Sequence, residues 1–193
     1  MPEHAMTRLN PRDPLVLDIR ELGRRPGSLR RIERSVPAPA GLGVELIGVQ
    51  EGAPLGLAFR LEAVVEGVLV SGTVTAPVRG ECGRCLTPFT DEVVVDLQEL
   101  FAYPDSVTEE TTEEGEVGRI ENDLINLDPY VRDAVVLGLP LSPLCRSDCR
   151  GLCVTCGTRW DELPAEHAHE QIDPRWAALA ERFSDQRTDS QEK

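Results

Sequence analysis

The sequence predicts an α+β fold in which an antiparallel β-meander or small barrel-like sheet precedes a helix, a cysteine-rich segment and a C-terminal helix. Several Val- and Leu-rich stretches alternate with polar residues and break at Gly or Pro, which is typical of a meander. Two Asp-Pro pairs, at 128–129 and 173–174, mark helix starts. Six cysteines, four of them at short spacings between the two expected helices, indicate a metal-binding segment there.

The first half of the chain supplies the sheet. Residues 1–13 are polar and Pro-rich, so we expect a loose N-terminus. The β-rich core should span 14–104 and contain an Arg-rich loop at 20–34, which Gly and Pro interrupt. The strands that we expect in this core cover 14–19, 44–49, 55–64, 66–78 and 92–101.

The second half is predicted to be acidic and then helical. Residues 105–122 carry seven carboxylates and few apolar side chains, which is typical of a solvated loop. Residues 123–183 should contain a helix that Asp128 caps and that ends at Gly138, then the cysteine segment, then the C-terminal helix. An apolar stripe on that last helix is expected to pack in the core: Trp176, Leu179, Ala180 and Phe183. Residues 184–193 are expected to be disordered.

Composition excludes some classes of function. Apolar residues make up 40% of the 193 residues, which suffices for a core. The net charge of −14, from 34 acids against 20 bases, argues against a protein that coats nucleic acid with its whole surface. No apolar run approaches the ~18 residues of a membrane span, and we see no export signal, so we expect a cytoplasmic protein without a membrane partner.

The cysteines indicate metal before they indicate disulfides, because disulfides are rare in a reducing compartment. Two C-x-x-C pairs and two further cysteines are followed by a His-Ala-His sequence, and thiolates and imidazoles are the ligands that structural zinc prefers. Eight ligands suffice for two closed sites, so we predict one or two structural zinc ions. The candidate metal ligands are Cys82, Cys85, Cys145, Cys149, Cys153, Cys156, His167 and His169.

Spacing alone leaves two ways to divide these ligands. The preferred partition places residues 82, 85, 145 and 149 around one ion and residues 153, 156, 167 and 169 around the other. The rival partition gathers the four cysteines between 145 and 156, and leaves the first C-x-x-C pair with the histidines. Both partitions use all eight ligands and leave no coordination position open for a substrate.

Catalytic interpretations find little support. The chain has no His-Glu-x-x-His motif, no Gly-rich phosphate loop and no nucleophile elbow, so we expect neither an enzyme nor a small-molecule substrate. A thiol redox role remains the weakest alternative, because Pro88 follows the first C-x-x-C too soon for the helix that activates such thiols. The Arg-rich loop is the candidate contact for nucleic acid or a partner, through Arg20, Arg24, Arg25, Arg30, Arg31 and Arg34.

These motifs resemble a known family. The segment Cys82-Gly83-Arg84-Cys85-Leu86-Thr87-Pro88 is similar to the C-x-R-C-L-x-P signature of the bacterial YceD family, also called large ribosomal RNA subunit accumulation proteins. The similarity continues through 139–145, 149–157 and 172–179, and in order and spacing covers about 14–183. Many members have Cys-x-Cys where this chain has His167-Ala168-His169, a change that keeps two zinc ligands.

The resemblance implies a non-enzymatic cytoplasmic factor that supports large-subunit ribosomal RNA accumulation or ribosome assembly. Its partner would be ribosomal RNA or a large-subunit assembly protein. An alternative is a zinc-stabilised protein-interaction module, unrelated to ribosomes, whose acidic surface binds a basic protein.

Overall fold

A computed structural model describes residues 9–113, 116–169 and 175. The chain divides into two compact units, 1–149 and 150–193, which we describe one at a time. The first unit contains a mostly antiparallel β-sheet with few helices, which confirms the general class predicted from the sequence. Within the described residues, no helix combines the length and the apolar character that crossing a membrane requires.

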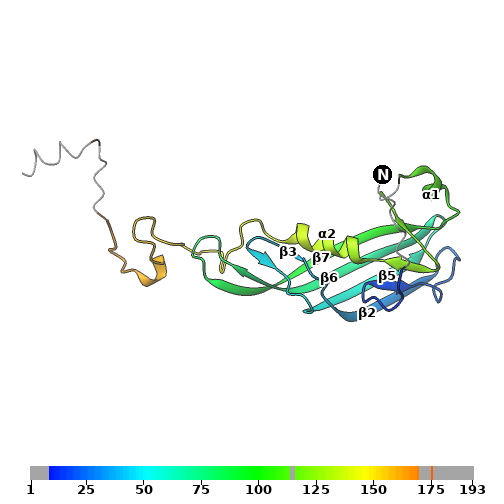
Figure 1. The fold of residues 1–193 in the computed structure, drawn as a ribbon, viewed down its shortest axis with the longest axis horizontal. Helices are drawn as coiled ribbons and strands as arrows, with labels where there is room; N and C mark the ends of the chain where they lie inside the picture. Colours follow the sequence, from blue (N-terminus) through cyan, green and yellow to red (C-terminus); the bar gives the residue numbers. More distant parts are fainter. Residues whose placement is uncertain (1–8, 114–115, 170–174, 176–193) are drawn as a thin grey trace, which may run out of the picture. The chain divides into compact units, whose positions relative to one another are not determined.

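A long hairpin forms the centre of the sheet in the first unit (Figure 1). Strand β6 (Gly67–Glu81) pairs with β7 (Pro88–Ala102) along its whole length, from Gly67 opposite Ala102 to Glu81 opposite Pro88. The turn between them, residues 82–87, carries the first C-x-x-C pair. The hairpin therefore presents two cysteines at its tip.

Other strands complete the sheet around this hairpin. Since β7 occupies one edge of β6, the opposite edge is shared by β5 along residues 68–75 and by β4 at residues 79–80. All pairings are antiparallel except that of β7 with β8. The remaining strands are β1 (Val16–Asp18), β2 (Leu29–Pro37), β3 (Gly43–Val44), β4 (Ile47–Gly48), β5 (Pro54–Ala63), β8 (Gly118–Arg119) and β9 (Leu124–Asn126).

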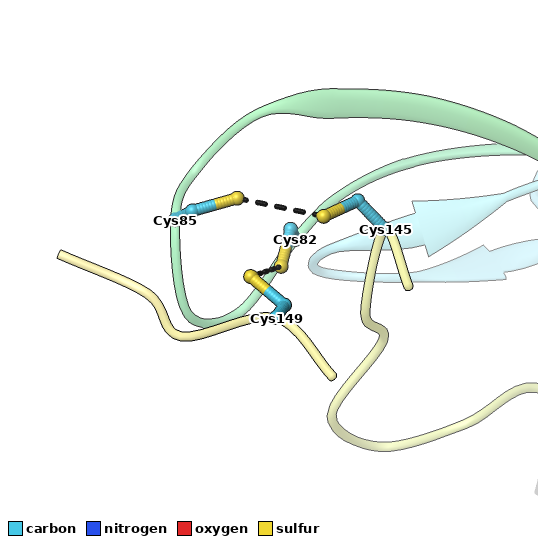
Figure 2. A group of neighbouring side chains, drawn as sticks. All are labelled: Cys82, Cys85, Cys145 and Cys149. Atoms are coloured by element: carbon cyan, nitrogen blue, oxygen red, sulfur yellow. Dashed lines mark hydrogen bonds between the residues drawn. The ribbon is translucent and has the colours of Figure 1, made fainter. Parts of the chain in front are cut away.

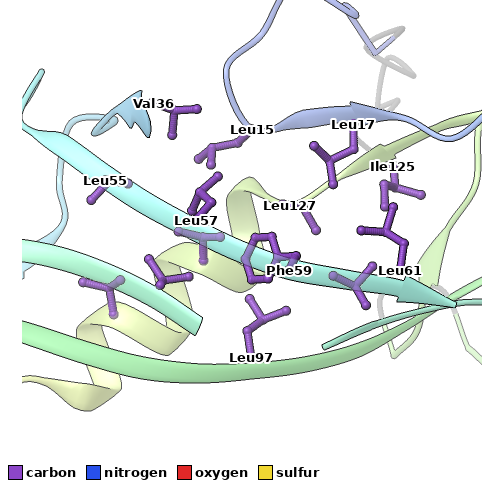
Figure 3. Packing of buried hydrophobic residues seen from close by; sticks show 14 of the residues in the cluster. Leu15, Leu17, Val36, Leu55, Leu57, Phe59, Leu61, Leu97, Ile125 and Leu127 are labelled. Carbon is purple, nitrogen blue, oxygen red and sulfur yellow. The ribbon is translucent and has the colours of Figure 1, made fainter. Parts of the chain in front are cut away.

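The core lies between one face of this sheet and the elements that cover it. Alternate residues of β5, namely Leu57, Phe59 and Leu61, point to this face and are buried, as the period of two in a strand requires. The two-stranded sheet of β1 and β9 packs against them, where Figure 3 shows Leu17 and Ile125 beside the β5 side chains. The alternating pattern read from the sequence thus identifies the buried face.

Helix α2 (Asp128–Gly138) covers the same face and packs on β7. Val131 and Val135, four residues apart, are fully buried on its inner side. The expected cap at its start differs: Asp128 is already in the helix, and its N–H donates to Oδ1 of Asn126 over 3.0 Å. The N-cap residue is Leu127, which makes no side-chain cap hydrogen bond, so the sequence predicted the helix correctly and its N-cap one residue late.

Two segments expected to be loops contain regular structure. Arg30, Arg31 and Arg34 lie in β2, because residues 29–37 pair in register with 54–62 of β5. The acidic segment contains α1 (Val107–Thr111), whose first turn is capped by the Ser106 hydroxyl, and strand β8. An Arg119–Glu109 ion pair offsets part of the negative charge that favoured a loop there.

The boundary between the two units lies between residues 149 and 150. Helix α2 and the chain that follows it, as far as Cys149, belong to the same unit as the sheet. The reason is packing: α2 contacts β7, and the chain after α2 returns to the tip of the hairpin. The expected C-terminal helix, its apolar stripe and the tail lie outside the described residues, apart from residue 175.

Candidate metal centres

The first ligand group consists of Cys82, Cys85, Cys145 and Cys149, whose Sγ atoms all lie within 4.8 Å of one another. Figure 2 shows that the first two come from the hairpin turn and the other two from the chain after α2. The Sγ of Cys82 is 3.7 Å from that of Cys149, and the Sγ of Cys85 is 3.6 Å from that of Cys145. All four thiols are free, so the sulfurs gather without a disulfide.

Backbone acceptors hold these two segments together. The Gly83 N–H donates to the Pro143 carbonyl over 2.8 Å. The Arg84 guanidinium donates to the Cys149 carbonyl over 2.9 Å. Both donors lie between the two cysteines of the turn, so the C-x-x-C turn itself fixes the position of the returning chain. Three of the four cysteines are buried in this arrangement.

The thiols of this group differ in acidity. Burial disfavours the Cys82 thiolate, but the backbone N–H groups of three neighbouring residues outweigh it and lower the pKa to about 6. The Thr87 hydroxyl, 3.2 Å from the Sγ of Cys85, lowers the pKa of that thiol. Burial and the other three sulfurs raise the pKa of Cys145 to about 12. Four thiols this close cannot all lose their protons unless a cation lies among them.

The second ligand group consists of Cys153, Cys156, His167 and His169, with ligand atoms again within 4.8 Å of one another. The Sγ of Cys156 is 3.7 Å from Nε2 of His167, and the two imidazole centroids are 4.5 Å apart. Backbone N–H groups of Cys156 and Thr155 lower the pKa of Cys153 to about 7. The two cysteines in turn raise the pKa of His169. Cys153 is buried and Cys156 is exposed.

The two C-x-x-C turns share one hydrogen-bond pattern. In the first, the Cys82 carbonyl accepts from the N–H of Leu86 over 2.9 Å, and the Cys82 N–H donates to the Thr87 carbonyl over 2.9 Å. In the second, Cys153 makes the same two bonds with Gly157 and Thr158, each over 2.8 Å. The residue after the second cysteine has positive φ in both turns, +58° at Leu86 and +71° at Gly157.

Sequence reasoning missed the two threonines of these turns. The Thr158 side chain lowers the pKa of Cys156, as Thr87 does for Cys85. Both threonines stand two positions after the second cysteine, in Cys-Leu-Thr and Cys-Gly-Thr. That repeat is visible in the sequence and would have identified both threonines as residues that hydrogen-bond to a candidate metal ligand.

Both groups have the dimensions of a tetrahedral metal site. Two thiolates bound to one zinc ion at 2.3 Å lie roughly 3.8 Å apart, and a thiolate and an imidazole roughly 3.6 Å apart. Three ligand pairs, at 3.6 to 3.7 Å, agree with these values, and all ligand atoms of each group lie within 4.8 Å of one another. Each group could therefore hold one metal ion with four protein ligands, and the ligands are grouped as in the preferred partition. The rival partition is not the grouping found.

The Arg-rich segment is used largely inside the fold. Arg34 donates from Nη2 to the carbonyls of Pro14, over 2.6 Å, and Val16, over 3.4 Å. Arg30 donates to the carbonyl of Asp18 over 3.2 Å. The carbonyls of Val16 and Asp18 belong to β1, that of Pro14 lies two residues before it, and the hydrogen-bonded partner strand of β1 is β9. Two arginines of β2 therefore join β1 to the main sheet through their side chains.

Two further arginines of this segment also have partners in the fold. Arg20 pairs with Asp18 and lowers the pKa of that carboxyl to about 2. Arg24 lies 4.8 Å from the centre of the Tyr103 ring, in a cation–π contact. Of the six arginines, only Arg25 and Arg31 make neither an ion pair nor a side-chain hydrogen bond within the described residues.

Comparison with known proteins bears on these ligand groups. The family profile described as large ribosomal RNA subunit accumulation protein YceD matches residues 70–181, which include all eight candidate ligands. The chain belongs to the YceD family. The profile does not reach the Arg-rich segment at 20–34.

Relatives of the YceD family support this membership. Uncharacterized protein Rv2926c of Mycobacterium tuberculosis is 55% identical over 87% of this chain and 81% of its own length. Uncharacterized protein ML1660 of Mycobacterium leprae is 49% identical over 87% of this chain and 77% of its own. Uncharacterized protein YlbN of Bacillus subtilis is 25% identical over 66% of this chain and 73% of its own length. No solved structure matches the chain.

Proposed function

We propose that this protein is a non-enzymatic cytoplasmic factor that supports the accumulation of large-subunit ribosomal RNA or assembly of the large subunit, stabilised by one structural zinc ion in each ligand group. The family description, which names large-subunit ribosomal RNA accumulation, supports the ribosomal role. The observation that carries the zinc part is the pair of preorganised four-ligand groups.

Zinc suits the donor set of both groups. Four thiolates, or two thiolates and two imidazoles, are the ligands of closed structural zinc sites. Four thiolates around one Zn²⁺ keep a net charge of −2, and the Arg84 guanidinium, which reaches the backbone of this group, offsets part of it. With all four positions taken by protein ligands, the role is to hold segments together and not to bind a substrate.

The first zinc would act as a staple within the first unit. It would fix the tip of the β6–β7 hairpin to the chain after α2, and so hold α2 on the sheet. Zinc binding to such a site contributes directly to the free energy of folding. Replacing Cys149 by Ser should therefore remove one zinc per chain and lower the thermal midpoint of the protein, whereas Ser147→Ala, at an exposed position between the ligands, should change neither.

Two measurements test the proposal. Metal analysis of protein purified without chelator should return two zinc ions per chain, and protein without zinc would refute the structural part. A lysate fractionated on a sucrose gradient should show the protein with large-subunit precursors, and depletion of the protein should lower large-subunit ribosomal RNA relative to small-subunit RNA. An unchanged ratio would refute the ribosomal part.

A second candidate is a zinc-stabilised interaction module for a basic protein partner outside the ribosome. The observation in its favour is charge: the chain is −14, and four of the six arginines in the predicted RNA contact have partners inside the fold. Nuclease treatment separates the two candidates. Association with precursors that is lost on RNA digestion supports RNA contact, for which Arg25 and Arg31 are the remaining candidates from that segment.

A further inference from the structure

The first unit contains a cavity of about 580 Å³ that none of the zinc ligands lines. It lies between the turn that precedes β1, the end of β2 and the start of α2. Its volume falls within the range of 300–1,000 Å³ that is typical of ligand sites in proteins.

The walls of this cavity are apolar and stiff. Leu15, Val16 and Ala38, all less than a tenth exposed, form part of the lining. Three prolines also line it, and a proline ring offers an apolar surface without a backbone N–H that would need a partner. These prolines come from the segments on either side of the cavity: Pro14, Pro37 and Pro39.

Among the described residues, the charged residues of the lining are all acidic. They are Asp13, Glu51 and Asp128, and no Arg, Lys or His of the described part of the chain joins them. Asp128 is partly neutralised by Arg132, 3.5 Å away, and by its place in the first turn of α2. Asp13 and Glu51 are exposed and have no ion-pair partner within the described residues. Two carboxylates without an ion-pair partner in the described part of the chain therefore stand beside an apolar cavity.

Two neutral amide side chains, those of Asn10 and Asn126, also line the cavity. The Oδ1 of Asn10 accepts from the Arg12 N–H, and the Oδ1 of Asn126 accepts from the Asp128 N–H. The side-chain NH₂ of Asn126 has no hydrogen-bond partner within residues 9–113, 116–169 and 175, so it is available to donate to a carbonyl. The site thus combines apolar walls, two exposed carboxylates and amide side chains, of which Asn126 offers a free donor.

We propose that this cavity binds an extended, basic segment of a partner protein. An aliphatic or proline side chain would occupy the cavity, flanking Lys or Arg side chains would pair with Asp13 and Glu51, and a backbone carbonyl would accept from Asn126. Nucleic acid does not fit this site, because its phosphates would meet carboxylates. The net charge of −14 would speed the approach of a basic segment at low salt. This inference stands whether or not the protein acts in ribosome assembly.

A randomised octapeptide library, selected on the full-length zinc-loaded protein, tests the proposal. We expect enrichment of peptides with at least two Lys or Arg around an aliphatic residue or proline. Binding of the enriched peptide, measured by fluorescence anisotropy, should weaken about tenfold in Asp13→Asn/Glu51→Gln, because two charge contacts are lost. The matched control is Asp91→Asn/Glu92→Gln, which removes two exposed carboxylates of β7 outside the cavity and should leave affinity unchanged.

Two more variants distinguish the occupant. Pro39→Trp places a large side chain at the cavity wall and should abolish binding while thermal unfolding stays cooperative. Protein lacking residues 1–8 should bind the peptide as the full chain does. The proposal is overturned if no peptide is enriched, if the enriched peptides lack basic residues, if neither cavity variant weakens binding, or if peptides bind only after residues 1–8 are removed.

Discussion

The second C-x-x-C turn offers a direct test of how tightly backbone geometry is linked to metal binding. Gly157 has a φ of +71°, and a Cβ built there would meet no atom within 4 Å. The cost of Gly157→Ala is therefore purely conformational, roughly 1 kcal/mol for a left-handed L-residue. Because Gly157 donates its N–H to the carbonyl of the ligand Cys153, we expect this cost to appear as an approximately fivefold loss of zinc affinity.

Competition with a chromophoric chelator measures that affinity, in a Cys149→Ser background where the second group is the site under observation. Gly23→Ala is the matched control: Gly23 has a φ of +69° and equally open surroundings, but it lies in the turn before β2, away from either ligand group. The control should lower the free energy of unfolding of the first unit and leave zinc affinity unchanged. Equal zinc affinities with and without the Gly157→Ala substitution would refute the link between turn and metal.

Three further outcomes are expected. Leu86→Gly should change the free energy of unfolding by less than about 1 kcal/mol. Glycine relieves the backbone cost at φ +58°, and this gain is offset by the lost burial of a side chain that is 60% exposed. Urea unfolding measures the change, and a larger change in either direction would contradict this balance. Arg34→Ala should lower the free energy of unfolding by roughly 2 kcal/mol as the β1 carbonyls lose a charged donor, whereas Arg31→Ala should change it by less than about 0.5 kcal/mol. The zinc affinity of the first group should fall as the pH is lowered from 8 to 6, roughly tenfold per pH unit for each proton that zinc displaces. The pKa of Cys145 is raised to about 12, so zinc must displace the proton of this thiol when it binds. Chelator competition at several pH values measures this, and an affinity independent of pH would contradict it.

The elements that the sequence predicted well are those set by local patterns. Period-two alternation identified β5 and β6, and Asp128-Pro129 with Gly138 gave the limits of α2. The spacing of the cysteines gave the ligand candidates, and the structure groups them as the preferred partition did. Local chemistry suffices there because each signal lies within a few residues of the feature that it determines.

The parts that the sequence did not predict depend on long-range contacts. Arg30 and Arg34 were assigned to a basic loop, since nothing near them in the sequence shows that β1 would present carbonyls to their side chains. The unit boundary after Cys149 likewise has no local signal in the sequence, because it depends on the return of the chain to the hairpin tip 67 residues earlier. The apolar cavity has contributions from four separate segments and carries no sequence motif at all.

The two ligand groups also differ in the length of chain that each one closes, and this bears on synthesis. Cys82 and Cys149 are 67 positions apart, whereas the second group spans only residues 153–169. Closing the longer loop costs about 1.3 kcal/mol more in chain entropy. During translation the hairpin thiols emerge long before their partners, and they can be joined only after β8, β9 and α2 have been made. Closure of the first group thus reports that the whole first unit has been synthesised, while the second group can assemble as soon as its own short segment is free.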